Sequence, residues 1–494
     1  MKKTTLMLFI AGMMVLVLFA PAAMAADYPQ AGQFIAHYDE DKLAKDTSSE
    51  NGGTTYSADE AVSKVVAKAT SPEVPVTAII TPVPDDWPQF MYDEENVGYS
   101  PCDGLPSSNT PNTYFDDREV IGTVNPVIAR GYVFLYTGYS GFDEPSGLST
   151  INLTCLYEDN LTVKWDFVLP RTQHLGSWGA PAFDGGYVYA ASDNKIYKIR
   201  VSDGHEMWNF TTIRNAICNG GLTVNTGPYV FGSDWYGDYY CLFKSNGTMK
   251  WVFNNTDTIW YDMTYSQATP AYDPDEGTQG KMYVCGWGYN SNTSFTGYLY
   301  KVDVAAGTED WSYGVGSSGT SESFCGSPSL DENNVYIASY SFNGDGNLYR
   351  ISKDRSSIVS RPIERTDATP SIDLVNDRVY ISGGWNGGDW GIAPPGVRCF
   401  QTDSSLTPVW TRYNESMGGW TGSVTIGEDS AGHKLVFAGK ESGDMNTFCY
   451  NTTYALYANN GTTKWSYPAG GATAAIANDK VYTAGNDGKL YVFG

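Results

Sequence analysis

Short runs of apolar and aromatic residues alternate with polar turns along most of this chain, from about residue 120 to the C-terminus. Residues 179–210, GAPAFDGGYVYAASDNKIYKIRVSDGHEMWNF, contain four such runs separated by turns rich in Gly, Asp and Asn. Runs of this length that are rich in Val, Ile, Tyr and Trp are typical of β-strands. The pattern predicts an all-β protein. The 53 Gly, 36 Tyr and 14 Trp of the chain fit many short strands joined by tight turns.

The four-run unit is repeated along the chain. Further copies lie at 268–313 and 326–354, and the slot near 358–360 lacks the Trp of the fourth run. That Trp recurs at Trp165, Trp208, Trp251, Trp311, Trp410 and Trp465. The spacing gives seven complete units and an eighth, residues 471–494, with only three runs. Four-stranded units of about 40–50 residues repeated in this way are typical of a β-propeller. We predict eight blades, with seven as the alternative.

The incomplete eighth unit raises the question of how the ring closes. Far upstream, DWPQFMYDEENVGYSP, residues 86–101, begins abruptly with a strand-like run at Trp87 that has no strand-like neighbour before it. A fourth strand taken from the other end of the chain leaves no open edge between the first and last blades. We therefore predict that the Trp87 strand completes the last blade.

The chain before the repeats has a different composition. Residues 1–25 have Lys2 and Lys3, an apolar run and a small-residue cleavage site, so they are predicted to be a secretory signal peptide. The alternative is that this segment is retained as an anchor. Residues 26–85 are rich in Ser, Thr and Pro and predict a flexible tether with one short helix. Residues 86–494 form the predicted propeller. No later segment is apolar enough to span a membrane, so we expect an exported protein, extracellular or at the cell surface.

Charge excludes some classes of partner. The formal net charge of −24 argues against nucleic acid and against an anionic membrane surface, because both are bound by Lys and Arg. The four His residues have no metal-binding spacing, so no metal site is predicted. The eight Cys include no adjacent pair and no CxxC motif. Four of them lie inside strand-like runs and are predicted to be buried thiols, with disulfides as the alternative in an exported protein: Cys155, Cys241, Cys399 and Cys449.

Nine Asn-x-Ser/Thr sequons predict a glycosylated exterior. They are Asn152, Asn160, Asn209, Asn246, Asn254, Asn292, Asn414, Asn451 and Asn460.

VSDGHEMWNF and VDVAAGTEDWSY, which end the units at Trp208 and Trp311, resemble the Trp-docking repeat of pyrroloquinoline-quinone-type (PQQ-like) propellers. The resemblance covers Asp86–Gly494, and it implies that the repeated Trp packs between neighbouring blades. The quinoprotein dehydrogenases of this family have a vicinal Cys pair, a calcium site and a catalytic Asp. Because this chain has no adjacent Cys pair and no CxxCH haem site, it is more similar to the non-catalytic envelope branch, which holds partner proteins. We expect no cofactor, and a quinoprotein oxidoreductase is the alternative function.

Aromatic residues gather in one class of predicted loops. The loops between the second and third strands share one face of the ring with the links between blades, because consecutive strands are antiparallel. These loops and links contain the candidate partner-binding residues Trp178, Trp235, Trp287, Trp385, Trp390 and Trp420. Such side chains suit an envelope protein or a glycan. We expect Trp235, Trp287, Trp385 and Trp390 to be at least partly exposed, with Trp208 and Trp311 buried between blades. The alternative is that the aromatic side chains only cap the ring.

Overall fold

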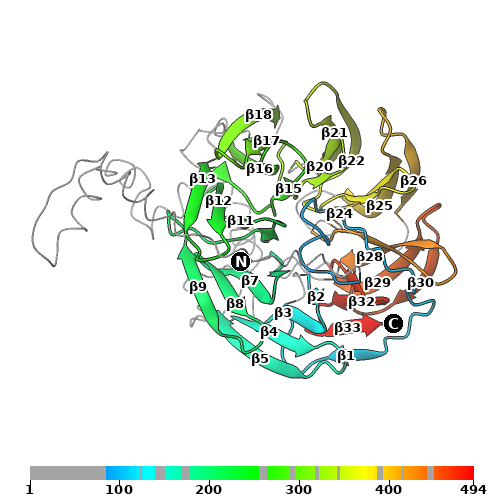
Figure 1. The fold of residues 1–494 in the computed structure, drawn as a ribbon. Helices are drawn as coiled ribbons and strands as arrows, with labels where there is room; N and C mark the ends of the chain where they lie inside the picture. Colours follow the sequence, from blue (N-terminus) through cyan, green and yellow to red (C-terminus); the bar gives the residue numbers. More distant parts are fainter. Residues whose placement is uncertain are drawn as a thin grey trace, which may run out of the picture. The chain divides into compact units, whose positions relative to one another are not determined.

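The computed structural model describes residues 85–494 except 122–124, 139–150, 170–178, 255–263, 290–294, 317–321, 342–344, 386–392, 414–416, 420 and 442–449. The predicted signal peptide and almost all of the predicted tether lie outside these residues. All the regular elements of the described part are β-strands, and they form eight antiparallel sheets arranged as the blades of a ring (Figure 1). The prediction of an eight-bladed propeller is confirmed. None of the described residues belongs to a helix that is long and apolar enough to cross a membrane.

The first four blades, in chain order, are blade 1 with β2(Val127–Ala129), β3(Tyr132–Thr137), β4(Ile151–Tyr157) and β5(Val163–Leu169); blade 2 with β6(Ala182–Asp184), β7(Tyr187–Ser192), β8(Lys195–Arg200) and β9(Glu206–Thr211); blade 3 with β10(Thr223–Val224), β11(Tyr229–Ser233), β12(Asp238–Phe243) and β13(Met249–Asn254); and blade 4 with β14(Thr264–Tyr265), β15(Ala271–Asp273), β16(Lys281–Tyr289), β17(Phe295–Asp303) and β18(Thr308–Val315).

The last four are blade 5 with β19(Ser329–Leu330), β20(Asn334–Ala338), β21(Asp345–Ser352) and β22(Ile358–Glu364); blade 6 with β23(Ser371–Asp373), β24(Arg378–Trp385), β25(Ala393–Gln401) and β26(Pro408–Arg412); blade 7 with β27(Thr425–Glu428), β28(Lys434–Glu441), β29(Tyr450–Tyr457) and β30(Thr463–Tyr467); and blade 8 with β31(Ala475–Ala477), β32(Lys480–Ala484), β33(Leu490–Phe493) and β1(Thr113–Phe115).

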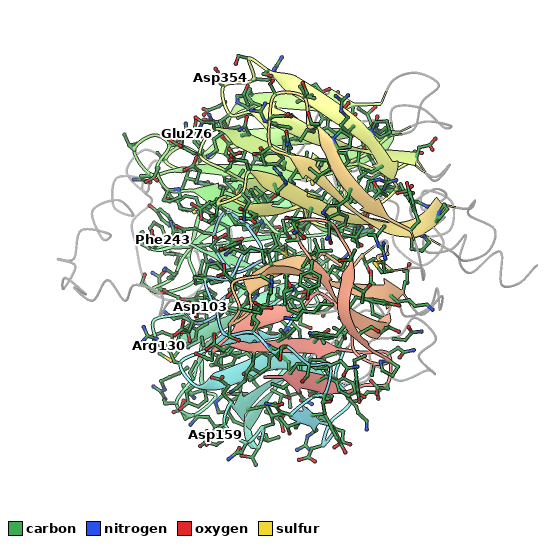
Figure 2. All side chains as sticks on the ribbon, turned by 90° about the vertical axis from the view of Figure 1, so that its right-hand side faces the viewer. Asp103, Arg130, Asp159, Phe243, Glu276 and Asp354 are labelled. Carbon is green, nitrogen blue, oxygen red and sulfur yellow. The ribbon has the colours of Figure 1, made fainter. Side chains whose placement is uncertain are left out.

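The ring has two faces that differ in their loops. In each blade the first strand lies nearest the axis and the fourth lies outside (Figure 1). One face, which we call the turn face, contains the turns that join strand one to strand two and strand three to strand four of each blade. The opposite face, with the loops between strands two and three and the links between blades, is the link face. Arg130, Asp159, Glu276 and Asp354 lie along the turn face (Figure 2).

Five of the six repeated Trp residues dock onto the next blade in the same way, as the resemblance implied. Their indole N–H donates to a backbone carbonyl oxygen beside the turn between strands three and four of that blade, whereas the indole N–H of Trp465 donates to Pro106 O at 3.3 Å. The pairs are Trp165 to Val201 (2.8 Å), Trp208 to Lys244 (3.1 Å), Trp251 to Val304 (2.9 Å), Trp311 to Lys353 (3.0 Å) and Trp410 to Ala458 (2.8 Å). In four of these turns a Gly with positive φ lies against the ring of the docking Trp, at Gly204, Gly247, Gly307 and Gly461, whereas the turn that faces Trp311 has Arg355 with positive φ. Trp208 is buried as expected, whereas Trp311 is only half-buried.

Two turns have a Leu where blades 2, 3, 4 and 7 have this Gly, and each of these Leu residues faces an outer strand of the preceding blade that has no docking Trp. Leu406 faces β22, the strand in which the sequence lacks a Trp, and Leu161 faces β1. Both Leu residues have positive φ, and both are buried in the seam between blades. The Leu side chain therefore fills space that an indole occupies elsewhere in the ring.

The predicted closing strand is wrong, although the ring does close with an N-terminal strand. The fourth strand of blade 8 is β1, in which Thr113 pairs with Val492 and Phe115 with Leu490. Trp87 instead makes a single antiparallel bridge to Ile128, on the innermost strand of blade 1. Pro88 follows Trp87 and has no N–H group, so a continuous ladder cannot extend from this point.

Residues 85–105, which we call the strap, run around the inside of the ring and contact the innermost strand of blades 1 to 7 and the turn that follows the innermost strand of blade 8. In seven blades the N–H at one equivalent position of that strand donates to the strap. The pairs are Ile128 to Trp87 O, Phe183 to Pro88 O, Val224 to Gln89 Oε1, Tyr272 to Glu94 O, Leu330 to Glu95 O, Ile372 to Val97 O and Ile426 to Gly98 O, at 2.7–3.0 Å. Blade 8 is contacted at both ends of the strap, by Asp85 O and by Gly104 N. The circuit satisfies donors that would otherwise point into the axis without a protein partner.

The docking geometry predicts a difference between two Gly residues that share a positive φ. A Cβ on Gly247 would lie 2.6 Å from the Trp208 ring, whereas a Cβ on Gly131 has no atom within 4 Å. Gly131→Ala should lower the free energy of unfolding by about 1 kcal/mol, through backbone strain alone. Gly247→Ala should lower it by about 1–3 kcal/mol more, because the Trp208 ring must move. Chemical denaturation measures both, and equal losses would contradict the docking role of the turn.

Closure by β1 predicts opposite behaviour for two neighbouring side chains. Phe115 is 3% exposed in the core of the closing seam, while Tyr114 on the other side of the same strand is 51% exposed. Phe115→Ala should cost about 3–5 kcal/mol, through lost burial and the cavity left behind. Tyr114→Ala should cost less than about 1 kcal/mol. Thermal unfolding of the two variants tests this, and a small effect of Phe115→Ala would mean that β1 does not hold blade 8.

Candidate functional site

A small polar cavity lies on the axis of the ring. Its volume is about 80 Å³, and its lining includes Phe90 of the strap together with residues that precede the first strands of the blades. Such lining residues are Asn125, Gly221, Thr269, Ser327, Thr369, Ser423 and Thr473. Phe90 and the strap form the end of the cavity toward the turn face.

The walls of the cavity are held by hydroxyl groups that link one blade to the next. Thr269 Oγ1 accepts a hydrogen bond from Gly221 N at 2.9 Å, and Thr269 N in turn donates to Ser327 Oγ at 2.8 Å. The same relation joins Thr369 N to Ser423 Oγ and Ser423 N to Thr473 Oγ1, at 2.8 and 2.9 Å. The recurring small polar residue before each first strand is therefore structural. Its sequence signal is the Thr-Pro or Ser-Pro pair, which precedes an apolar strand in blades 4, 5 and 6.

Three consecutive carboxyl groups lie in the middle of the strap. Glu94 Oε2 accepts a hydrogen bond from Thr226 N at 2.9 Å, and Asp93 Oδ1 accepts one from Val97 N at 2.9 Å. Burial, reinforced by the neighbouring Glu95, raises the pKa of Glu94 to about 8. Burial also raises the pKa of Glu95 to about 7 and raises that of Asp93. These groups are the most strongly perturbed carboxyls of the strap.

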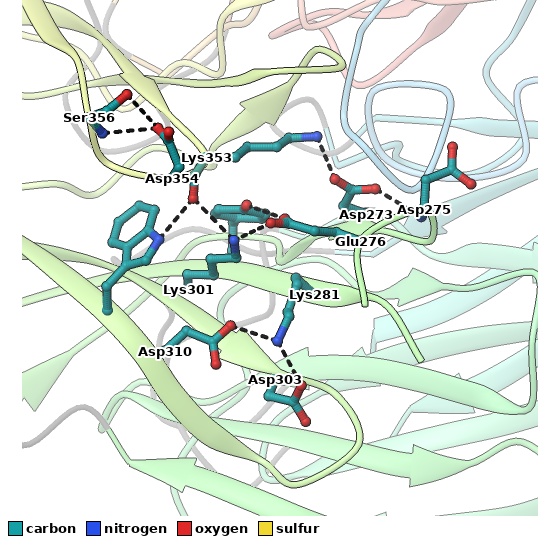
Figure 3. A network of polar contacts seen from close by, with 12 residues as sticks. Asp273, Asp275, Glu276, Lys281, Lys301, Asp303, Asp310, Lys353, Asp354 and Ser356 are labelled. Atoms are coloured by element: carbon teal, nitrogen blue, oxygen red, sulfur yellow. Dashed lines mark hydrogen bonds and ion pairs between the residues drawn. The ribbon is translucent and has the colours of Figure 1, made fainter. Parts of the chain in front are cut away.

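Lysines from the blades face this acidic segment but are already paired. Lys353 Nζ lies 2.5 Å from Asp273, and Lys244 Nζ lies 2.7 Å from Asp184. Figure 3 shows the Lys353–Asp273 pair at the edge of a larger network on the turn face of blades 4 and 5. In that network Lys301 binds Glu276, and Lys281 lies between Asp303 and Asp310 at 2.7 and 2.6 Å. The cations of this region therefore stabilise blade carboxylates first.

The described part of the link face includes an aromatic patch on blade 3, which we call the blade 3 patch. It consists of Ile213, Arg214, Trp235 and Tyr236. Ile213 and Arg214 are exposed, and Trp235 and Tyr236 are half-buried. The Arg214 guanidinium lies 5.2 Å from the centre of the Tyr236 ring and 2.8 Å from Asp238.

Hydrogen bonds hold the blade 3 patch in place. Trp235 N donates to Ile217 O at 2.7 Å, and Trp235 O accepts from Ser266 N at 3.3 Å. Behind them, Tyr240 OH donates to Asp234 at 2.6 Å, and burial raises the pKa of Asp234 to about 7. The loop that presents Trp235 is therefore tied to two neighbouring links.

The other predicted partner-binding residues give a mixed result. Trp178, Trp390 and Trp420 lie outside the described residues, and Trp385 is placed only as the last residue of β24. Trp287 is 2% exposed, so the expectation of exposure was wrong for this residue. It lies inside the long strand β16, where it pairs with Gly297 of β17 and with Tyr265 of β14. Strands β16 and β17 are longer than the sequence pattern indicated, so Trp287 lies in a strand and not in the loop.

Three of the nine sequons share one turn conformation. In each, the Asn Oδ1 accepts hydrogen bonds from both the backbone N–H and the hydroxyl of the Thr two residues later. They are Asn160, Asn246 and Asn460 in exposed turns of blades 1, 3 and 7. Asn209 and Asn254 are exposed on outer strands, Asn152 and Asn451 are half-buried in β4 and β29, and Asn292 and Asn414 lie outside the described residues. The turn geometry explains three of the recurrences without any glycan.

All seven cysteines of the described part are buried and free, which agrees with the thiol prediction for Cys155, Cys241 and Cys399. The fourth predicted thiol, Cys449, lies outside the described residues. No group of three or more His, Cys, Asp or Glu side chains in the described ranges is arranged to hold a metal ion.

Comparison with known proteins agrees with this geometry. A family model described as outer membrane protein assembly factor BamB matches residues 165–344, a stretch from the Trp of blade 1 into blade 5. The chain is an eight-bladed β-propeller, and the matched stretch is similar to the PQQ-like family. No curated protein matches it at a significant level.

Several solved structures share the fold of this propeller at low identity. BamB from Moraxella catarrhalis is 14% identical with a TM-score of 0.53, over 78% of this chain and 99% of that one. A europium-containing methanol dehydrogenase is 12% identical with a TM-score of 0.61, over 83% and 98%. A quinohemoprotein alcohol dehydrogenase from Comamonas testosteroni is 13% identical with a TM-score of 0.58, over 84% and 81%. These similarities show the fold alone, because the sequences are only 12–14% identical.

The different placement of two Trp residues predicts different effects of their removal. Trp287→Ala should lower the free energy of unfolding by about 3–5 kcal/mol, because the side chain is fully packed. Trp235→Ala should lower it by clearly less, because the half-buried ring leaves a smaller cavity. Chemical denaturation of both variants measures the difference. Losses of the same size would mean that Trp235 is as structural as Trp287.

Proposed function

We propose that this PQQ-like propeller is a non-catalytic binding scaffold that is exported or displayed at the cell surface. The observation that carries the proposal is the blade 3 patch on the link face. Its composition of Trp, Tyr, Arg and Ile is similar to that of interface hot spots, in which Trp, Tyr and Arg dominate the binding energy. A Trp held by backbone hydrogen bonds loses little conformational entropy when a partner binds.

The central cavity supports the non-catalytic part of the proposal. Pockets that bind cofactors or drug-sized ligands have volumes of about 300–1,000 Å³. The axial cavity measures about 80 Å³, and Phe90 occupies its end toward the turn face. A quinoprotein oxidoreductase needs a large planar cofactor and its substrate near this axis. The small volume of the described cavity therefore supports a binding role over the alternative function.

Different observations support a protein and a glycan as the partner of the link face. The family model that matches this chain is described as an outer membrane protein assembly factor, which favours a protein partner. A half-buried Trp beside a Tyr also suits the apolar face of a sugar ring. The proposal of export is based on the signal-like residues 1–25. The proposal of a cell-envelope partner is based on the family description given above.

Binding and catalysis can be separated by one set of measurements. We expect no substrate-dependent dye reduction after addition of pyrroloquinoline quinone and Ca²⁺, and we expect envelope-extract protein or an arrayed glycan to bind. Trp235→Ala should weaken that binding by roughly tenfold or more, which corresponds to about 1.4 kcal/mol. Tyr157→Ala is the matched control, since Tyr157 is 39% exposed on the opposite face. Dye reduction with an alcohol, or equal binding by both variants, would contradict the proposal.

A further inference from the structure

Three sequons of the described part have a side-chain amide nitrogen that the fold does not use. In Asn160, Asn246 and Asn460, Oδ1 accepts a hydrogen bond from the N–H of the Thr two residues later, at 2.9–3.0 Å. A backbone N–H can only donate, so the atom that faces it is the oxygen and not Nδ2. No described residue accepts a hydrogen bond from Nδ2 of these three side chains, and all three are exposed.

The turn itself needs the oxygen and not the nitrogen. In blade 2, Asp203 Oδ1 accepts a hydrogen bond from His205 N at 3.1 Å. In blade 5, Asp354 Oδ1 accepts from both the N–H and the hydroxyl of Ser356, at 2.9 and 2.7 Å. In both turns the middle residue has positive φ, as it has in the three Asn turns. A carboxylate has no N–H group, so these turns form without an amide.

The other sequons of the described part lack this free nitrogen or are less accessible. Asn209 and Asn254 are exposed on outer strands, but their Nδ2 groups donate to Glu206 at 2.6 Å and to Asp238 at 2.5 Å. The sequons within β4 and β29 are half-buried. Of the seven sequons that the structure describes, only the three turn asparagines therefore combine an exposed side chain with an uncommitted amide nitrogen.

We propose that Asn160, Asn246 and Asn460 are attachment sites for N-linked saccharides, an inference that rests on the export included in the proposed function. In the transfer, Nδ2 forms a bond to the anomeric carbon of a saccharide that a carrier holds through a phosphate group. The bond between that carbon and the phosphate oxygen breaks, the phosphate leaves with the bonding electrons, and Nδ2 gives up one proton to a base of the transferase. The Thr N–H and hydroxyl stabilise the negative charge that develops on Oδ1 as this proton leaves.

All three sites lie on one face of the ring. Each is in a turn between strands three and four, in blades 1, 3 and 7, and these turns belong to the turn face. Asp159, which precedes Asn160, marks this face in Figure 2. N-linked saccharides are bulky and strongly hydrated, so they would cover the turn face. The blade 3 patch, on the opposite face, would remain accessible to its partner.

Glycopeptide mass spectrometry of the full chain, purified from the cells that produce it, tests the assignment with internal controls. Peptides that contain Asn160, Asn246 and Asn460 should have the added mass of a saccharide, whereas those with Asn209 and Asn254 should be unmodified. Unmodified asparagines in the three turns, or equal modification of Asn209 and Asn254, would overturn the proposal. Fractionation of the same cells measures export separately, so failure of the saccharide sites is distinguishable from failure of the proposed export.

Two variants in the same cells test whether the turn selects the site. Asp354→Asn supplies an amide to a turn that already has the required geometry, and Ser356 completes the sequon, so this variant should gain a saccharide at position 354. No gain there would contradict selection by the turn.

The matched change Asn246→Asp keeps the acceptor oxygen and removes only the amide nitrogen. It should fold normally, as judged by circular dichroism, and lose the saccharide at position 246. If this variant does not fold, the turn needs the nitrogen and the inference is wrong.

Discussion

The unpaired inner edge of each blade is the constraint on which the rest of this structure depends. A four-stranded antiparallel sheet has two edges, and in a propeller one edge of every sheet faces the axis. The backbone N–H groups on those edges need acceptors, because a buried donor without a partner is strongly destabilising. Here a single segment of about twenty residues supplies the acceptors, so one stretch of chain contacts all eight blades in order. The ring is therefore held both by its seams and by a shared inner contact.

The seams between blades show how one repeat tolerates exceptions. Wherever an outer strand has a docking Trp in blades 1, 2, 3 and 6, the facing turn has a Gly, since a Cβ there would meet the ring. Where the Trp is missing, Leu161 or Leu406 takes the same positive-φ position and fills the gap. In these six seams the residue in the turn therefore matches the residue on the facing outer strand, while the seam between blades 4 and 5 pairs Trp311 with a turn that has Arg355. This complementarity explains why the irregular slot at β22 does not interrupt the ring.

Much of the fold could be predicted from the sequence because the repeat specifies it. The spacing of the Trp residues gives the number of blades, and the three-stranded unit at the C-terminus gives the site of closure. The closing strand itself was missed, because Thr113–Phe115 is only three residues long and has no periodic pattern. The strap was missed for a different reason: it forms no regular element, and its contacts use main-chain carbonyl groups that any residue provides. Trp287 was misplaced because the length of the β16–β17 hairpin depends on pairing, not on composition.

The same two-faced geometry separates stability from recognition. On the turn face, short turns hold side-chain caps such as the Asn–Thr pair at Asn246, docking sites for Trp rings, and ion pairs such as Lys353–Asp273. A change in the length of one of these turns would disturb the contact between two neighbouring blades. The indole N–H groups of the docked Trp residues donate to carbonyl groups on the turn face, so these hydrogen bonds do not constrain the described loops of the link face. A ring fixed from its inner and turn-face sides can therefore present different recognition surfaces on its link face.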